Sequence, residues 1–196
     1  MKYLFIDTST TNLVVAIVIN DSLVYFNNEK CMQSMSIRIM PMIDEAFENA
    51  NITINEIDKI FVCNGPGSFT GIRIGITFAK TLAWALNIPV VPLSTLEVMA
   101  SKEASMAIVN ARRGYVFAGG YNDLLDNEFK DQYILLENID TKLPFVSYDS
   151  LDVDTKVPEP DILKIVNKHK NDEGVNPHSL NPVYLKQTEA EEKLNG

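Results

Sequence analysis

Three short apolar runs open the chain and are separated by polar turns. Residues 2–7, 13–20 and 22–28 are rich in β-branched and other apolar side chains, and the letters TSTTN and ND lie between them. Runs of this kind, bounded by turn residues, predict strands joined by tight connections. The pattern therefore predicts a three-stranded antiparallel edge of a sheet.

Helical and strand patterns then alternate up to about residue 94. Residues 34–50 and 70–86 predict helices, and residues 59–63 and 88–94 predict strands. Thr53 and Glu56 have the spacing of a capping box before a short helical turn. This order predicts an α/β lobe in which the antiparallel strands are followed by αβαβ crossovers.

The signals weaken in the second half of the chain. Residues 105–122 predict two strands around an Arg-Arg-Gly turn, residues 144–149 predict another strand, and a helix is expected after Pro158 and Pro160. We expect two lobes, a complete one over residues 1–103 and a smaller α/β lobe over residues 104–196.

Composition and charge narrow the classes of function. With 46% hydrophobic residues, 22% charged residues and a formal charge of −9, the chain is typical of a soluble globular protein and a poor ligand for nucleic acid. No apolar run is long enough to span a membrane, and the N-terminus is not typical of a signal peptide, so we expect a cytoplasmic protein. Cys31 and Cys63, and His169 and His178, lack metal-ligand spacing, so no metal site is expected.

Two stretches carry candidate chemistry. In the first, Asp7 ends a strand and Thr8 and Ser9 begin the following turn, as in a phosphate-binding hairpin with an acid that positions a metal. The same residues also suit a turn whose side chains bond to their own backbone, and the spacing alone favours that simpler interpretation.

The second stretch reads CNGPGSFTGIRIG over residues 63–75. Gly65 and Gly67 allow unusual backbone angles, Pro66 fixes the turn, and Ser68 or Thr70 can cap the helix that follows. Free amides at a helix N-terminus favour an anion. The segment is neither a Walker A loop nor a dinucleotide fingerprint. Local physics leaves a capped structural turn and a phosphate loop both open, and favours the turn.

The two long helices offer a candidate partner interface. The first has one apolar arc, and the second is apolar over more than half of its circumference, so it needs cover on more than one side. The ridge formed by Gly71, Gly75 and Ala79 would let a neighbouring helix approach closely. Packing within the chain explains these patterns equally well. The candidate interface residues are Met35, Ile39, Met42, Ile43, Gly71, Ile74, Gly75, Phe78, Ala79 and Leu82.

Several segments together resemble the TsaB (YeaZ) family. They are FIDTSTTNLVVAIV near the N-terminus, residues 40–100 with GPGSFTGIRIG at their centre, NARRGYVF, and NPVYLK near the C-terminus. The resemblance covers residues 1 to about 120 well and is thin over residues 121–180. This chain has Met35 and Ser36 where many members carry His-Ser, and its second lobe is shorter than usual.

The resemblance implies an actin-like ATPase (ribonuclease H-like) fold with a degenerate second lobe. It further implies a non-catalytic adaptor in the formation of threonylcarbamoyladenosine next to the tRNA anticodon. The implied partners are a TsaD-like transferase and a TsaE-like ATPase, and the resemblance implies that the complex uses ATP while this chain has no cofactor and no catalytic residue of its own. It also implies that the chain contacts tRNA only indirectly and forms a homodimer when it is alone. Asp7, Thr8, Ser9, Gly65, Gly67, Ser68 and Thr70 would then be vestigial phosphate loops.

Other functions fit the sequence less well. A small actin-fold kinase or acyl-phosphate enzyme is the leading alternative, but the second half offers no second phosphate hairpin. A glycoprotease would need a metal pair or an activated nucleophile, and the sequence shows neither. Direct tRNA binding would need a positively charged surface, whereas the chain has a formal charge of −9.

Overall fold

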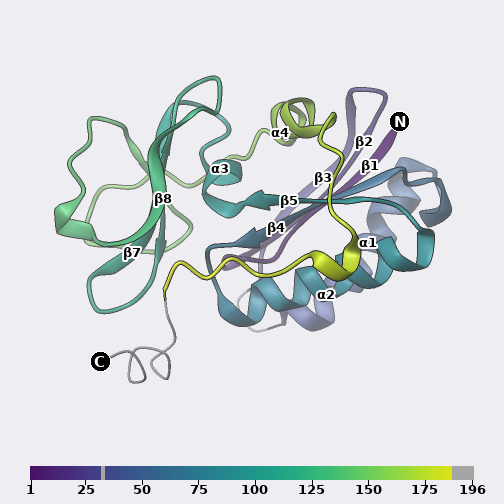
Figure 1. The fold of residues 1–196 in the computed structure, drawn as a ribbon, viewed down its shortest axis with the longest axis horizontal. Helices are drawn as coiled ribbons and strands as arrows, with labels where there is room; N and C mark the ends of the chain where they lie inside the picture. The colour runs from purple at the N-terminus through teal and green to yellow at the C-terminus, as the bar shows by residue number, and fades with distance from the viewer. Residues whose placement is uncertain (32–33, 187–196) are drawn as a thin grey trace.

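The computed structural model describes residues 1–31 and 34–186, which form two lobes joined by a short helix (Figure 1). The first lobe holds a five-stranded sheet in the order β3-β2-β1-β4-β5. Its strands are β1 (Lys2–Asp7), β2 (Asn12–Ile19), β3 (Ser22–Lys30), β4 (Lys59–Gly65) and β5 (Val90–Ser94). β1 pairs antiparallel with β2 and parallel with β4, so the predicted change from meander to crossovers occurs at β1.

Two long helices cover one face of this sheet. They are α1 (Met35–Ala50) and α2 (Phe69–Leu86), and the short helical turn Ile54–Glu56 connects α1 to β4. Alternate residues of β1, such as Leu4 and Ile6, point into the core beneath the helices, together with Ile43 and Ile72. The predicted capping box forms, because the Glu56 carboxylate accepts the Thr53 amide hydrogen at 2.7 Å.

The opposite face of the sheet is covered by the helix α4 (Ile162–His169). This helix follows the second lobe in sequence, yet Ile162 and Ile165 pack against Phe5 and Phe61 of the first sheet. The chain then bonds to the first lobe again, where Val175 pairs with Val90. Residues beyond about 160, which the sequence pattern grouped with the second lobe, therefore complete the core of the first.

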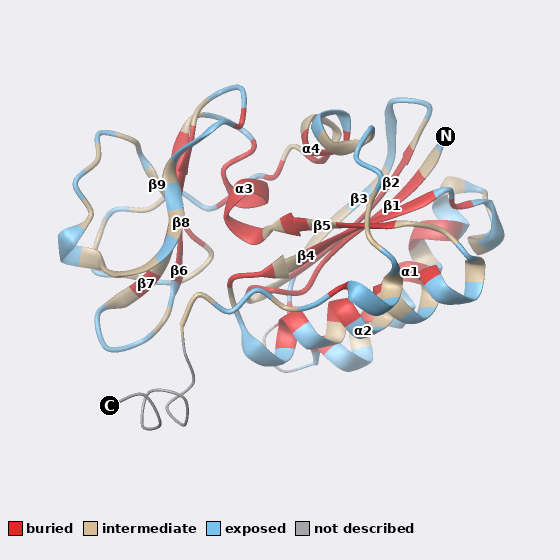
Figure 2. Ribbon diagram, in the orientation of Figure 1, coloured by how far each residue is buried: buried red, intermediate tan, exposed pale blue. Residues whose placement is uncertain are grey.

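The second lobe is a four-stranded sheet in the order β8-β7-β6-β9. Its strands are β6 (Ser105–Asn110), β7 (Tyr115–Tyr121), β8 (Asn127–Leu135) and β9 (Phe145–Val146), and the turn Leu136–Asn138 follows β8. The helix α3 (Thr95–Met99) joins the lobes and is buried along its length (Figure 2). Leu96 and Met99 of α3 pack on the second lobe, whereas Val98 packs on the first, so this helix is shared by both cores.

The predicted elements of the first lobe are all present, and those of the second lobe only in part. The strand expected over residues 144–149 is limited to Phe145–Val146, and neither β8 nor α3 was predicted. Among the described residues, no helix combines the length and hydropathy needed to cross a membrane.

Candidate functional site

The two candidate loops lie side by side at the ends of β1 and β4 and are bonded to each other. The Ser68 amide donates to the Ser9 carbonyl oxygen at 2.7 Å, and the Thr8 hydroxyl donates to the Gly71 carbonyl oxygen at 2.7 Å. The Ser68 hydroxyl caps α2 by accepting the Gly71 amide hydrogen at 3.2 Å. Some of the polar groups that a phosphate cradle would offer to a ligand are thus used within the chain.

Asp7 is enclosed rather than presented to a ligand. Its carboxylate accepts the Ser9 amide at 2.7 Å and also the Ser9 hydroxyl, and the residue is only 1% exposed. Burial raises the pKa of Asp7, and burial together with the charge of Asp7 raises the pKa of the neighbouring Cys63 thiol. A carboxylate held in this way has the geometry of a turn that bonds to its own backbone.

Close contact explains the glycines of the second loop. A Cβ at Gly67 would overlap the carbonyl oxygen of Ser9, and a Cβ at Gly65, where φ is +122°, would lie 2.5 Å from the carbonyl oxygen of Val183. Thr70 is exposed at the start of α2. The loop is therefore a tight connection pressed between the β1–β2 turn and the C-terminal segment.

The small-residue ridge of α2 faces this chain and not a neighbour. A Cβ at Gly71 would overlap the backbone of Thr8, and one at Gly75 would overlap the Thr8 side chain. Ala79 is fully buried in the same core. The close approach expected from these residues occurs, but the β1–β2 turn makes it, so the three residues are unavailable to a partner.

The outer side of α2 borders an apolar groove of about 820 Å³ between α1 and α2. Four of the candidate interface residues line this groove, namely Ile39, Ile74, Phe78 and Leu82. Three others, Met35, Met42 and Ile43, are buried in the core beneath α1. Met40, which is 48% exposed, and Phe69, which is 49% exposed, add large apolar side chains to the lining. A groove of this size and composition is typical of a binding surface.

An aromatic and cationic cluster stands at the N-terminal end of α2. The Arg73 guanidinium lies 3.8 Å from the centre of the Phe69 ring, and its Nε donates to the Tyr184 hydroxyl at 3.1 Å. The Phe69 and Tyr184 rings stack with their centres 5.2 Å apart. The sequence analysis did not identify this cluster; the spacing of Phe69 and Arg73, one helical turn apart, was the available signal.

A second hollow, of about 530 Å³, lies between the lobes. Ser9, Gly67 and Thr70 line it from the first lobe, and Asn110 and Arg112 from the second. In the described part of the chain, no group of three or more His, Cys, Asp or Glu side chains could hold a metal ion. Asp7, the acid of the first candidate loop, does not line this hollow.

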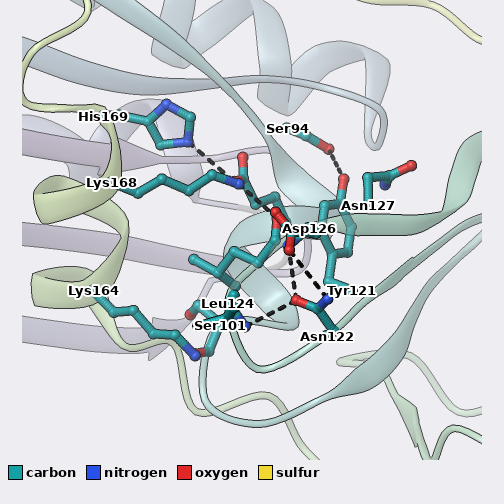
Figure 3. Close-up of polar contacts among 12 residues, drawn as sticks. Ser94, Ser101, Tyr121, Asn122, Leu124, Asp126, Asn127, Lys164, Lys168 and His169 are labelled. Atoms are coloured by element: carbon teal, nitrogen blue, oxygen red, sulfur yellow. Dashed lines mark hydrogen bonds and ion pairs between the residues drawn. The ribbon is translucent and has the colours of Figure 1, made fainter.

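Charged side chains of α4 contact the linking helix α3 and the second lobe. Lys168 Nζ lies 2.7 Å from Glu97 Oε1 and donates to the Leu125 carbonyl oxygen at 2.6 Å, and His169 Nε2 lies 3.0 Å from the same Glu97 oxygen. Figure 3 shows Lys168 and His169 reaching from α4 toward the β7–β8 loop, which carries Leu124 and Asp126. No local pattern in the sequence predicts the contact between Lys168 and Glu97, because the two residues lie 71 positions apart.

The pKa values of this cluster follow from its contacts. Hydrogen bonding to Glu97 raises the pKa of His169, and the nearby Asp172 carboxylate, 2.7 Å from Nδ1, adds to the shift. Burial alone would raise the pKa of Glu97, but the hydrogen bonds from His169 and Lys168 outweigh it and lower the pKa. The Glu97 carboxylate is therefore held ionised by its contacts with Lys168 and His169.

The two sheets, joined by α3, define a two-lobed α/β protein. Residues 27–145 match the family model described as TsaD, tRNA N6-adenosine threonylcarbamoyltransferase. The chain is 33% identical to the Bacillus subtilis tRNA threonylcarbamoyladenosine biosynthesis protein TsaB, with 98% of this chain and 97% of that protein covered. The chain belongs to the TsaB (YeaZ) family.

Further comparisons agree with this assignment. The protein of the same name from Buchnera aphidicola subsp. Schizaphis graminum is 36% identical, with 71% of each chain covered. The structure of YeaZ from Pseudomonas aeruginosa superposes with a TM-score of 0.80 and 24% identity, covering 94% of this chain and 99% of that one. The sequence matches support involvement in tRNA threonylcarbamoyladenosine biosynthesis, and the structural match supports the fold.

Proposed function

We propose that this chain is a non-catalytic subunit in tRNA threonylcarbamoyladenosine biosynthesis and that it binds a TsaD-like transferase through the groove between α1 and α2. The groove supports this proposal most strongly, because it leaves Phe78, Met40 and Phe69 open to a partner on an otherwise well-packed helix pair. In this role the chain would act as a platform, contact tRNA only indirectly and help to recruit a TsaE-like ATPase, and the complex rather than this chain would use ATP.

The closed loops support the non-catalytic part of the proposal. Asp7 is bonded to Ser9, and the Ser68 amide is used by the Ser9 carbonyl oxygen, so neither group is presented to a nucleotide. The alternative, a small ATP-dependent kinase or acyl-phosphate enzyme, would have to break these contacts before it could bind a phosphate. We expect the isolated chain neither to hydrolyse ATP nor to transfer threonylcarbamoyl to tRNA.

A charge placed in the groove tests the partner surface. Ala85 is exposed and lines the groove, so Ala85→Glu should leave the fold intact and weaken binding of the transferase subunit from the same organism at least tenfold. Val157→Glu is the matched control, because Val157 is 71% exposed on the second lobe, away from the groove. Calorimetric titration of the two variants and the wild type measures the difference.

Two results would contradict the proposal. If the folded Ala85→Glu variant binds the transferase as tightly as Val157→Glu, the partner surface lies elsewhere. If the isolated wild-type chain turns over ATP or modifies tRNA, the chain is an enzyme.

Pairing of two copies through the same groove is the expected state when the transferase is absent, and sedimentation of the wild type alone measures it.

A further inference from the structure

The groove between α1 and α2 is uncharged except at one point. Its lining consists of aliphatic, aromatic, hydroxyl and methionine side chains, and Arg73 is the one charged residue among the described residues that line it. An arginine covered by a partner must be paired, because burial of an unpaired charge is costly. The occupant of the groove must therefore supply a group that suits a guanidinium.

The arginine is held in place before any partner arrives. Stacking on Phe69 and the hydrogen bond from Nε to Tyr184 restrict the side chain from two sides. Among the described residues, the Tyr184 hydroxyl is the one hydrogen-bond partner of the Arg73 side chain, and none of the ion pairs includes Arg73. A planar guanidinium with free N–H groups matches a carboxylate.

A second copy of this chain fits the groove less well than a different protein. Symmetric pairing would bring two copies of the same lining together, and with them two guanidiniums and no carboxylate from either lining. Asp44 and Glu48 of α1 are exposed but lie outside the lining. An arginine covered without a carboxylate partner disfavours association, and such a cost is a common basis of partner choice.

We propose that Arg73 is the specificity-determining residue of the groove, and that it selects a partner helix with an apolar face and an aspartate or glutamate over a second copy of this chain. The proposal rests on the proposed function, because it takes the groove to be the partner surface. Tyr184 acts as a positioning residue, since its hydroxyl orients the guanidinium without reaching the occupant's carboxylate.

Variants of the full chain test the role of the charge. Arg73→Gln should weaken binding of the transferase subunit at least tenfold, and Arg73→Lys should fall between it and the wild type, because lysine keeps the charge but loses the planar fork. Tyr184→Phe keeps the stacked ring and removes the acceptor, so a smaller loss of about threefold is expected. Raising the salt concentration should reduce the difference between the wild type and Arg73→Gln.

Self-association distinguishes this proposal from a general effect on the surface. Sedimentation should show that Arg73→Gln pairs with itself as well as or better than the wild type. The proposal is overturned if Arg73→Gln binds the transferase within twofold of the wild type, or if it loses self-association to the same extent as transferase binding. If instead Ala85→Glu leaves transferase binding intact, the groove itself is not the partner surface and the proposed function fails first.

The acidic residues near the end of the chain provide a further control. Glu189, Glu191 and Glu192 lie outside the described residues, and a chain that stops after Lys186 lacks them. This shortened chain should keep its affinity for the transferase within twofold and should still respond to Arg73→Gln. If the response to Arg73→Gln disappears in the shortened chain, the carboxylate comes from this protein and the proposal is overturned.

Discussion

The two sides of α2 are built for different purposes. On the inner side, Gly71 and Gly75 lie against Thr8 so closely that no side chain could be added. On the outer side, Phe78 and Ile74 border an open groove. A helix apolar around most of its circumference can therefore combine complete packing on one side with an available surface on the other, and small residues mark the packed side.

A matched pair of substitutions on α2 tests this difference most severely. Ala79→Glu places a carboxylate at a fully buried site and should cost about 4 kcal/mol or more in the free energy of unfolding. Ala85→Glu, at an exposed site on the same helix, should change it by less than about 0.5 kcal/mol. Urea denaturation of both variants measures the contrast, and equal losses would show that the two sides do not differ in packing.

The loop before α2 should respond like the inner side of the helix. Gly67→Val would force a branched side chain against the Ser9 carbonyl oxygen, so we expect a loss of about 3 kcal/mol. Thermal unfolding and nucleotide titration should be measured together. A variant with full stability that lost an affinity for ATP present in the wild type would make the loop a ligand site after all.

The polar cluster around Glu97 can be compared with the apolar packing of α2. Glu97→Gln removes the charge that Lys168 and His169 share, and should cost about 2 kcal/mol, because Glu97 is buried and both of its charged partners lose the carboxylate. Asp172→Asn is the control, because the Asp172 side chain is more than half exposed and, among the described residues, its carboxylate contacts only Nδ1 of the same histidine. Similar losses for both variants, measured by urea denaturation, would mean that burial of Glu97 adds nothing.

The smallest expected effect is a dependence of stability on pH. The pKa of His169 is raised in the folded chain, so its contribution is fully present below the ordinary histidine pKa of about 6.5 and is lost as the pH rises through the folded value. The pKa of Glu97 is lowered, so this carboxylate stays ionised throughout that range. The change should be no more than about 1 kcal/mol, because His169 is partly exposed to solvent.

Thermal unfolding between pH 6 and 8.5 checks this sign. The wild type should lose stability relative to His169→Gln as the pH rises, and the curves should run parallel above the folded pKa of His169. A wild type that gains stability over this range relative to His169→Gln would contradict the placement of the ring between two carboxylates.

The first lobe could be predicted from the sequence because its signals are local. The strands and helices up to Ser94 follow from apolar periodicity and turn residues within short windows. The strand β8 was missed because its first half is strongly polar, with Asn127, Glu128, Lys130 and Asp131 among its first five residues. Its carboxylate Asp131 accepts hydrogen bonds from Ser94 and Tyr121, contacts that no local pattern reveals.

The sequence predicted some of the residues that line the groove, but not which side of α2 faces a partner. Apolar periodicity identified Ile39, Ile74, Phe78 and Leu82, which line the groove. It also selected Gly71, Gly75 and Ala79, since a ridge of small residues has the same appearance whether it meets another chain or the same chain. Only the position of Thr8, more than 60 residues earlier in the chain, distinguishes the two cases.

The packing of α4 on the first sheet has a consequence for synthesis on the ribosome. Phe5 and Phe61 are made before β5, but Ile162 and Ile165, which cover them, are added long after β5 is complete. At about 5–20 residues per second, this face of the sheet would stay open for several seconds while the second lobe is translated. A nascent chain of this protein is therefore expected to offer a hydrophobic sheet to chaperones until translation has passed α4.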